Sequence, residues 1–188
     1  TWYRAVVKQG GCGEQTSNVV KITVTPAPIQ ANGGANQTIC GNSINLQGND
    51  PMGQTAVWSQ VSGPAANLNQ IGRLAVITGM SAGTYVFSYT ITSGSCGSSI
   101  SNVVVKVEDA TVGGNISSPM TVCGTTNSGT LTATGFVGNI VRWESSTDNF
   151  GTIITYNNTD MTQDFFDLTE TTQFRAIVKN GNCPEMAS

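Results

Sequence analysis

Histidine is absent from this chain of 188 residues, and charged residues make up only 10% of it. Without histidine the chain lacks the commonest general base and the commonest metal ligand of proteins. Its eight Lys and Arg residues are scattered and outnumbered by eleven Asp and Glu residues, so we expect no basic patch for phosphate groups. These shortages argue against a nucleic-acid partner and against attachment to an anionic membrane surface.

Long apolar runs and helical periodicity are also missing. No run reaches the length of a membrane span, so we expect no membrane insertion. No long stretch repeats its apolar residues with the period of an amphipathic helix. Instead, short runs of alternating apolar and polar residues are separated by Gly, Pro, Asn and Ser. This pattern predicts an all-β chain built as antiparallel β-sandwiches from short strands.

The chain does contain an internal repeat. The segment 1–12, TWYRAVVKQGGC, returns at 172–183 as TQFRAIVKNGNC, and the two segments align without a gap. A fixed period indicates that each unit is a structural module in an array. We therefore expect this chain to be a window cut from a longer repetitive protein, beginning and ending inside modules.

Turn residues and the repeat together divide the chain into three parts. We expect 1–25 to be the C-terminal hairpin of a truncated module, with Pro26 and Pro28 stiffening the linker that follows. Residues 26–108 are predicted to form a complete sandwich, and 109–188 a sandwich that lacks its last strand. The expected strands of these two modules are 37–40, 43–47, 55–61, 73–78, 84–92 and 99–107, then 120–123, 128–134, 139–144, 153–156, 162–168 and 172–179.

Aromatic residues at matching positions mark the two predicted cores. Trp58 and Trp143 lie in the middle of corresponding strands, where packing is favoured over ligand stacking. Tyr85 begins a strictly alternating aromatic face and is typical of a tyrosine corner, in which the phenol bonds back to the chain just upstream. Phe174 occupies the same position in the last module. We expect all four aromatic side chains to lie in the cores.

Five cysteines recur at two positions of the repeat. Cys40 and Cys123 lie at an early strand of their modules, and Cys96 and Cys183 follow the corner strand at similar spacings. This recurrence predicts one disulfide inside each module, Cys40–Cys96 and Cys123–Cys183, with free structural thiols as the alternative. Cys12 matches the second position, so its partner is expected upstream, outside this chain. Five cysteines in a β-rich chain favour an oxidising compartment, and a zinc site would need closely spaced pairs.

No convergent set of side chains suggests catalysis, so we expect neither an enzyme nor a cofactor. One local acidic cluster lies in the last module, and a second, weaker calcium candidate, Glu108–Asp109, lies at the module junction. Asp164 and Asp167 are expected on opposite faces of a strand, which favours a solvated strand over a calcium site. The cluster consists of Asp160, Asp164, Asp167 and Glu170.

The sequence resembles two kinds of repeat. The segments 35–41 (ANQTICG), 57–64 (VWSQVSGP) and 82–85 (AGTY) resemble a PKD-like immunoglobulin-type domain. The last module, with VRWESS at 141–146 and LTETTQFRA at 168–176, is similar to repeats of giant SprB-type gliding-motility adhesins. The resemblance therefore implies tandem immunoglobulin-like, PKD-like sandwiches.

The adhesin resemblance also implies a function. It implies a structural segment of a filament on the bacterial outer cell surface, exported by type IX secretion, that gives reach and mechanical stability for attachment and gliding. Its implied partners are adjoining repeats, extracellular polysaccharide or the substratum, and the motility and secretion machinery. The alternative is a carbohydrate-binding accessory module of a secreted protein, for which three aromatics without an evident core face could supply contacts: Phe150, Tyr156 and Phe165.

Overall fold

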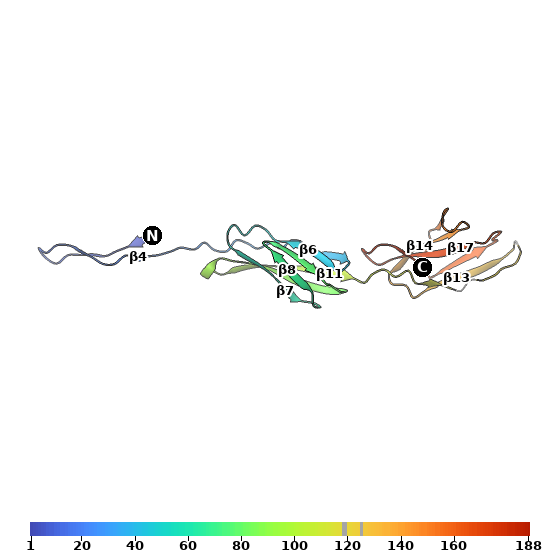
Figure 1. The fold of residues 1–188 in the computed structure, drawn as a ribbon, viewed down its shortest axis with the longest axis horizontal. Coiled ribbons are helices and arrows are strands. Elements are labelled where there is room, and N and C mark those ends of the chain that lie inside the picture. The colour runs from blue at the N-terminus through green and yellow to red at the C-terminus, as the bar shows by residue number, and fades with distance from the viewer. Residues whose placement is uncertain (118–119, 125) are drawn as a thin grey trace.

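The computed structural model describes the chain except for residues 118–119 and 125. The described residues form β-strands and one short 3-10 turn, which confirms the expected all-β class. Figure 1 shows an elongated molecule in which an N-terminal hairpin is followed by two sandwiches placed end to end. No helix in the described ranges is long and apolar enough to cross a membrane.

The N-terminal hairpin repeats the geometry of the end of the chain. Its four short strands pair as β1 with β4 and β2 with β3. When residue 1 is aligned with residue 172, the pairing of Val6 with Thr16 becomes that of Ile177 with Ala187, which the structure also shows. The sequence repeat is therefore also a structural repeat. The strands are β1 (Trp2–Tyr3), β2 (Val6–Val7), β3 (Gln15–Thr16) and β4 (Val20–Lys21).

The first sandwich has a four-stranded sheet with the order β5-β11-β10-β7 and a three-stranded sheet with the order β6-β9-β8. All neighbouring strands are antiparallel except β5, which runs parallel to β11 and pairs Cys40 with Glu108. A 3-10 turn, η1 (Gly94–Cys96), connects β10 to β11. The strands are β5 (Gln37–Cys40), β6 (Ser43–Gln47), β7 (Thr55–Ser62), β8 (Asn67–Ile71), β9 (Leu74–Thr78), β10 (Gly83–Thr92) and β11 (Ser98–Glu108).

The first core forms around the alternating face of β10. Tyr85 and Tyr89 are fully buried, and Trp58 is 3% exposed. The Tyr85 hydroxyl donates to the carbonyl of Ser81 at 3.0 Å and accepts from its backbone N–H at 2.8 Å, which is the corner geometry. The indole N–H of Trp58 donates to the carbonyl of Arg73 at 3.0 Å. Each large side chain thus buries its apolar body while its polar atom finds a backbone partner.

The second sandwich packs a sheet of order β12-β13-β16 against one of order β15-β14-β17-β18. Trp143 is fully buried at its centre, and Phe174 is half-buried against the same cluster. Residues 120–123, expected as a strand, form none, so that expectation is wrong. The strands are β12 (Asn115–Ile116), β13 (Ser128–Thr134), β14 (Asn139–Ser146), β15 (Ile154–Tyr156), β16 (Thr162–Phe166), β17 (Gln173–Lys179) and β18 (Met186–Ala187).

Candidate functional site

The junction between the two sandwiches carries a disulfide bond. Cys40 at the end of β5 is bonded to Cys183, which follows β17 in the second sandwich. Their Cα atoms lie 4.9 Å apart, although 143 residues separate them in the sequence. The other three cysteines, Cys12, Cys96 and Cys123, are exposed free thiols. The predicted pairs Cys40–Cys96 and Cys123–Cys183 are therefore wrong, because the sulfur bridge joins the modules to each other.

Strand direction explains why Cys40 cannot reach Cys96. Cys40 pairs with Glu108 at the last residue of β11, whereas Cys96 lies just before the first residue of that strand. At about 3.3 Å per residue, the length of β11 separates its two ends by roughly 35 Å. A disulfide requires Cα atoms within about 7 Å of each other. The two cysteines thus mark opposite ends of one sandwich.

The same reasoning separates Cys123 from Cys183. Cys183 lies beyond the C-terminal end of β17, at the junction with the first sandwich. The neighbours of Cys123, Val122 and Gly124, share a groove with Gln173, the first residue of β17. The length of this strand, about 20 Å, therefore lies between the two regions. Similar spacing in the sequence did not reveal which end of a sandwich each cysteine occupies.

A tight turn reinforces the sulfur bridge. The backbone N–H of Asn182 donates to the carboxylate of Glu108 at 2.7 Å, and its side-chain amide donates to the carbonyl of Thr38 at 3.2 Å. Asn180 donates its side-chain amide to the carbonyl of Asp109 at 2.8 Å. Gly181 lies between them with a φ of +49°, and a Cβ atom there would collide with the Glu108 carboxylate. Glu108 and Asp109, proposed above as a weak calcium candidate, instead accept hydrogen bonds from this turn.

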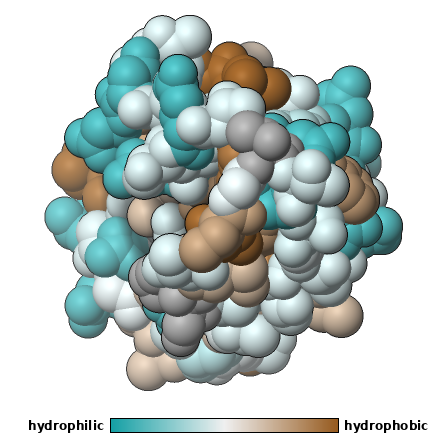
Figure 2. Space-filling model, turned by 90° about the vertical axis from the view of Figure 1, so that its right-hand side faces the viewer, coloured by the Kyte–Doolittle hydropathy of each residue, from teal (hydrophilic) through white to brown (hydrophobic). Residues whose placement is uncertain are grey.

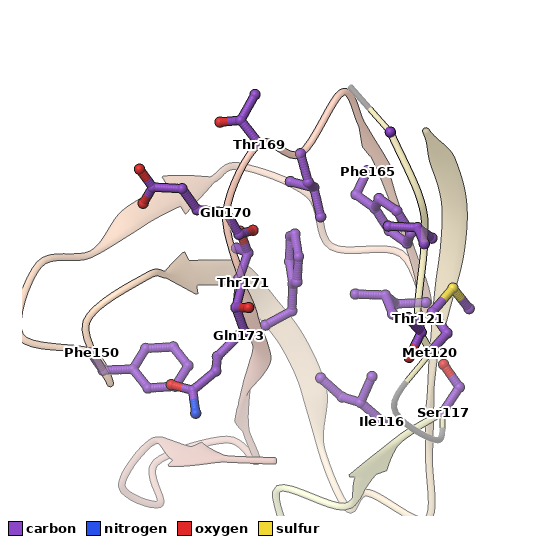
Figure 3. A pocket seen from close by; sticks show the side chains of 16 residues that line it. Ile116, Ser117, Met120, Thr121, Phe150, Phe165, Thr169, Glu170, Thr171 and Gln173 are labelled. Atoms are coloured by element: carbon purple, nitrogen blue, oxygen red, sulfur yellow. The ribbon is translucent and has the colours of Figure 1, made fainter. Parts of the chain in front are cut away.

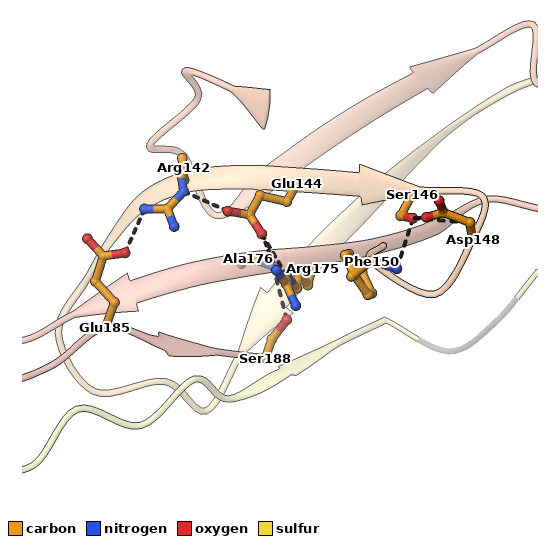
Figure 4. Close-up of polar contacts among 9 residues, drawn as sticks. All are labelled: Arg142, Glu144, Ser146, Asp148, Phe150, Arg175, Ala176, Glu185 and Ser188. Atoms are coloured by element: carbon orange, nitrogen blue, oxygen red, sulfur yellow. Dashed lines mark hydrogen bonds and ion pairs between the residues drawn. The ribbon is translucent and has the colours of Figure 1, made fainter. Parts of the chain in front are cut away.

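A charged network on the second sandwich supports the turn that carries Cys183. The carboxylate of Glu144 is 4% exposed and accepts hydrogen bonds of 2.7 Å from Arg142 and from Arg175 (Figure 4). Arg142 also donates to Glu185, just after Cys183, at 2.7 Å. Burial raises the pKa of Glu144, but the hydrogen bonds from both guanidinium groups outweigh it and leave this pKa below its ordinary value. The network therefore links β14 to β17 and to the junction turn.

The loop after β14 is held by Asp148. Ser146 donates its hydroxyl to the Asp148 carboxylate at 2.6 Å, and the backbone N–H of Thr152 donates to it at 2.7 Å. These hydrogen bonds lower the pKa of Asp148 to about 2, with the largest effect from Ser146 and the next largest from Thr152. Phe150 in this loop lies under the guanidinium group of Arg175, with 4.0 Å between the Arg175 Cζ and the ring centroid. The Phe150 ring is therefore already in a cation–π contact within the sandwich.

The three aromatic residues considered for sugar contacts do not form an exposed row. Phe150 stacks with Arg175, and Phe165 is only 6% exposed in the second core. Tyr156 is half-buried, and its hydroxyl lies 3.0 Å from that of Ser145. These aromatics stabilise the sandwich and do not present a stacking platform.

The acidic residues of the last module do not converge either. Asp164 accepts a hydrogen bond of 2.6 Å from the hydroxyl of Thr130 on the neighbouring strand. Within the ranges that the structure describes, no three Asp, Glu, Cys or His side chains lie together as metal ligands would. Asp164 is therefore part of the strand pairing of β13 and β16.

An apolar groove of about 770 Å³ lies at the end of the second sandwich away from the junction. Figure 3 shows Phe165, Met120 and Ile116 on one side and Gln173 on the other. Figure 2 views the molecule from this end, where brown hydrophobic side chains lie among pale and teal polar ones. In the N-terminal hairpin, β4 pairs with Trp2 and Tyr3, which are equivalent to Gln173 and Phe174. Gln173 and Phe174 both line the groove.

Comparisons with known proteins agree with the fold. The family described as "Domain of unknown function (DUF8696)" matches residues 112–188. No curated protein matches the chain. The titin fragment I67–I69, as an E-to-A mutated variant, is 10% identical with a TM-score of 0.53, over 95% of this chain and 69% of that one. This likeness shows the class: an all-β chain of tandem immunoglobulin-like sandwiches.

Two further solved structures match with lower TM-scores. The PKD domain from the KIAA 1837 protein is 25% identical, with a TM-score of 0.38, over 54% of this chain and all of that chain. A two-domain fibronectin type III segment from chicken tenascin is 14% identical, with a TM-score of 0.37, over 88% of this chain and 98% of that chain.

Proposed function

We propose that this chain is a structural repeat segment of a giant filamentous cell-surface adhesin and gives that filament reach and mechanical stability. One observation carries the proposal: the two sandwiches are arranged end to end and are covalently bridged at their junction by Cys40–Cys183. Each sandwich has its own core, so folding alone does not call for a bond between them. A bond at the junction resists bending and separation, which are the demands on a stalk.

Strand pairing in the first sandwich suits a protein under tension. When the sulfur bridge is reduced, force applied along the molecule pulls the start of β5 and the end of β11 in opposite directions. Because these strands are parallel, the force shears their register pairs, from Val105–Gln37 to Glu108–Cys40, all at once. Hydrogen bonds loaded together resist more force than bonds opened one after another. This arrangement favours a mechanical role.

The disulfide also shortens the covalent route through the molecule. A chain pulled at its two ends transmits force along residues 1–40, across the sulfur bridge and into residues 183–188. Residues 41–182, which supply all of the second core and most of the first, form a closed loop beside this route. Force on the filament can therefore reach the turn of the second sandwich without unfolding either core.

Location and partners follow from the resemblance and the chemistry. A disulfide persists in an oxidising space, which suits the outer cell surface and export by type IX secretion. The proposed partners are adjoining repeats of the same protein, extracellular polysaccharide or the substratum, and the motility machinery that would move the filament. An antibody against this chain should label intact cells, and the labelled points should move along the cell during gliding. Labelling only after cells are broken open would contradict the surface location.

Stiffness of the junction gives a direct test in solution. We expect the two sandwiches of the oxidised chain to tumble as one elongated body in NMR relaxation measurements. A Cys40→Ser, Cys183→Ser double variant, which keeps both cores, should show more independent tumbling. Two sandwiches that tumble independently in the oxidised chain would contradict a stalk.

The groove of the second sandwich supports one alternative, a carbohydrate-binding accessory module. Its volume of about 770 Å³ is suited to a small ligand, and Glu170 and Gln173 bring polar groups to its apolar walls. A glycan array tests this function separately from stiffness. Binding that Gln173→Ala abolishes, with the fold intact, would favour the alternative. No binding to any glycan leaves the structural role.

A further inference from the structure

Cys96 lies at the end of the first sandwich that faces the N-terminal hairpin. It closes η1, and its Sγ atom donates to the carbonyl of Thr25 at 3.2 Å. Thr25 belongs to the linker that leaves the hairpin, shortly after Ile22. Ile22 exchanges backbone hydrogen bonds with Thr1, with distances of 2.9 and 3.1 Å. The exposed thiol of Cys96 is therefore directed toward the base of the hairpin.

Cys123 lies at the corresponding end of the second sandwich. Its neighbours Val122 and Gly124 line the groove together with Thr172, and the carbonyl of Gly124 accepts a 2.9 Å hydrogen bond from Asn127. Thr172 is the residue equivalent to Thr1 in the sequence repeat. Cys123 therefore lies near the position that the base of the hairpin occupies in its own module.

The sequence repeat assigns Cys96 and an equivalent of Cys123 to the same junction of the proposed array. In the proposed array, residues 1–24 are the C-terminal hairpin of the preceding module, so Thr1 is that module's equivalent of Thr172. That module would therefore carry its own equivalent of Cys123 near Thr1. Thr1 is hydrogen-bonded to Ile22, which is close to Thr25 and Cys96. In such an array, Cys96 and this equivalent of Cys123 would both lie at the junction that precedes the first sandwich, and both are exposed free thiols in this chain.

We propose that Cys96 forms a second class of inter-module disulfide, with the cysteine equivalent to Cys123 in the preceding repeat unit. This inference rests on the proposed array. Counted along such an array, the separation between Cys123 and the following equivalent of Cys96 nearly equals the separation of 143 between Cys40 and Cys183. Both kinds of junction would then carry one sulfur bridge enclosing loops of nearly equal length.

Formation of the bridge needs an oxidant that itself carries a disulfide, such as oxidised glutathione. One protein thiolate attacks that disulfide, forms a mixed disulfide and releases one small thiol. The second protein thiolate attacks the mixed disulfide and releases the other small thiol. The two protein sulfurs lose two electrons and two protons in total, and the oxidant gains them.

Two sulfur bridges per unit would give the filament two parallel covalent routes. One route uses the Cys40–Cys183 bridge and the segment from Cys12 to Cys40, which includes β5. The other uses the new bridge and the segment from Cys96 to Cys123, which includes β11. Because β5 and β11 pair side by side, both routes would run through the same sheet.

The test uses a two-unit chain in which residue 171 of the first unit is followed directly by residue 1 of a full second unit. This join preserves the repeat, since Thr172 is equivalent to Thr1. The two-unit chain contains nine cysteines, four from the first unit and five from the second. After oxidative refolding with glutathione, we expect three free thiols: Cys12 and Cys96 of the first unit and Cys123 of the second. Without the proposed bridge, five thiols would remain free.

A matched pair of variants identifies the bridge. The first carries Cys96→Ser in unit one and Cys123→Ser in unit two. It therefore keeps only the facing pair, which is Cys123 of unit one and Cys96 of unit two. The second carries Cys123→Ser in unit one and Cys96→Ser in unit two. It therefore keeps only the outer pair, which is Cys96 of unit one and Cys123 of unit two. We expect one free thiol in the first variant and three in the second, with a crosslinked Cys96–Cys123 peptide only in the first.

The outcomes separate this inference from the proposed function. If Cys40 of unit one pairs with Cys12 of unit two while the facing pair stays reduced, the new bridge is overturned and the array stands. If neither inter-unit bridge forms in a folded chain, both proposals are overturned.

Discussion

Reduction of the Cys40–Cys183 bond should change how far this molecule can be stretched. The Cα atoms of the two residues lie 4.9 Å apart in the folded chain, while 143 residue steps join them along the sequence. A fully extended chain spans at most about 3.3–3.6 Å per residue, so this loop could lengthen by about 500 Å. With the bond intact, the same residues contribute nothing to the length, because force passes through the sulfur atoms.

A single-molecule pulling experiment with handles at residues 1 and 188 measures this directly. The oxidised chain should yield only the short extension of the segments outside this loop, of which the N-terminal hairpin is the longest. The same chain in reductant, or the Cys40→Ser, Cys183→Ser variant, should add unfolding steps that sum to about 500 Å. Cys96→Ser is the matched control and should behave like the oxidised wild-type chain. Unfolding steps of the full size in the oxidised chain would refute the reasoning.

Three further predictions concern the sandwiches and their junction. Trp143→Ala removes a fully buried side chain and should lower the free energy of unfolding by about 3–5 kcal/mol in denaturant titrations. Phe166→Ala, at an exposed site, should change this free energy little. Equal effects of the two substitutions would contradict the assigned core. The pKa of Asp148 is lower in the folded chain than its ordinary 3.8, so its contribution to stability is full above 3.8 and is lost as the pH falls toward about 2. Asp148→Asn should flatten the acid dependence of the melting temperature over that range, and an unchanged dependence would argue against the Ser146 and Thr152 bonds. Gly181→Ala should speed cleavage of the junction disulfide by reductant several-fold, because the new Cβ displaces Glu108, while Gly10→Ala, at the equivalent turn with open space, should not; equal rates would contradict the clamp.

Local patterns predicted much of the fold. The alternation in the first sandwich predicted strands at 37–40 and 43–47, and the structure has β5 and β6 at those residues. Alternation works here because one face of each strand is buried and the other is solvated. It failed for β8, where Asn67, Asn69 and Gln70 make the strand too polar to stand out, and for 120–123, where apolar residues border an open groove.

The junction could not be predicted in the same way. Spacing between cysteines gives the length of chain between two sulfurs, but it does not say at which end of a sandwich each one lies. That depends on β5 pairing parallel to β11, a long-range choice that no local pattern encodes. The network around Glu144 was also missed, although Arg142 and Glu144 are charged residues that flank the buried Trp143 on the same strand. Charges within a core strand were the signal that could have identified it.

Non-reducing peptide mapping of the 188-residue chain, after alkylation of free thiols, tests the central claim most directly. A bridged junction predicts one crosslinked peptide pair that joins Cys40 to Cys183, with Cys12, Cys96 and Cys123 all alkylated. A map that joins Cys40 to Cys96, or that finds Cys40 alkylated in the folded oxidised chain, would contradict it.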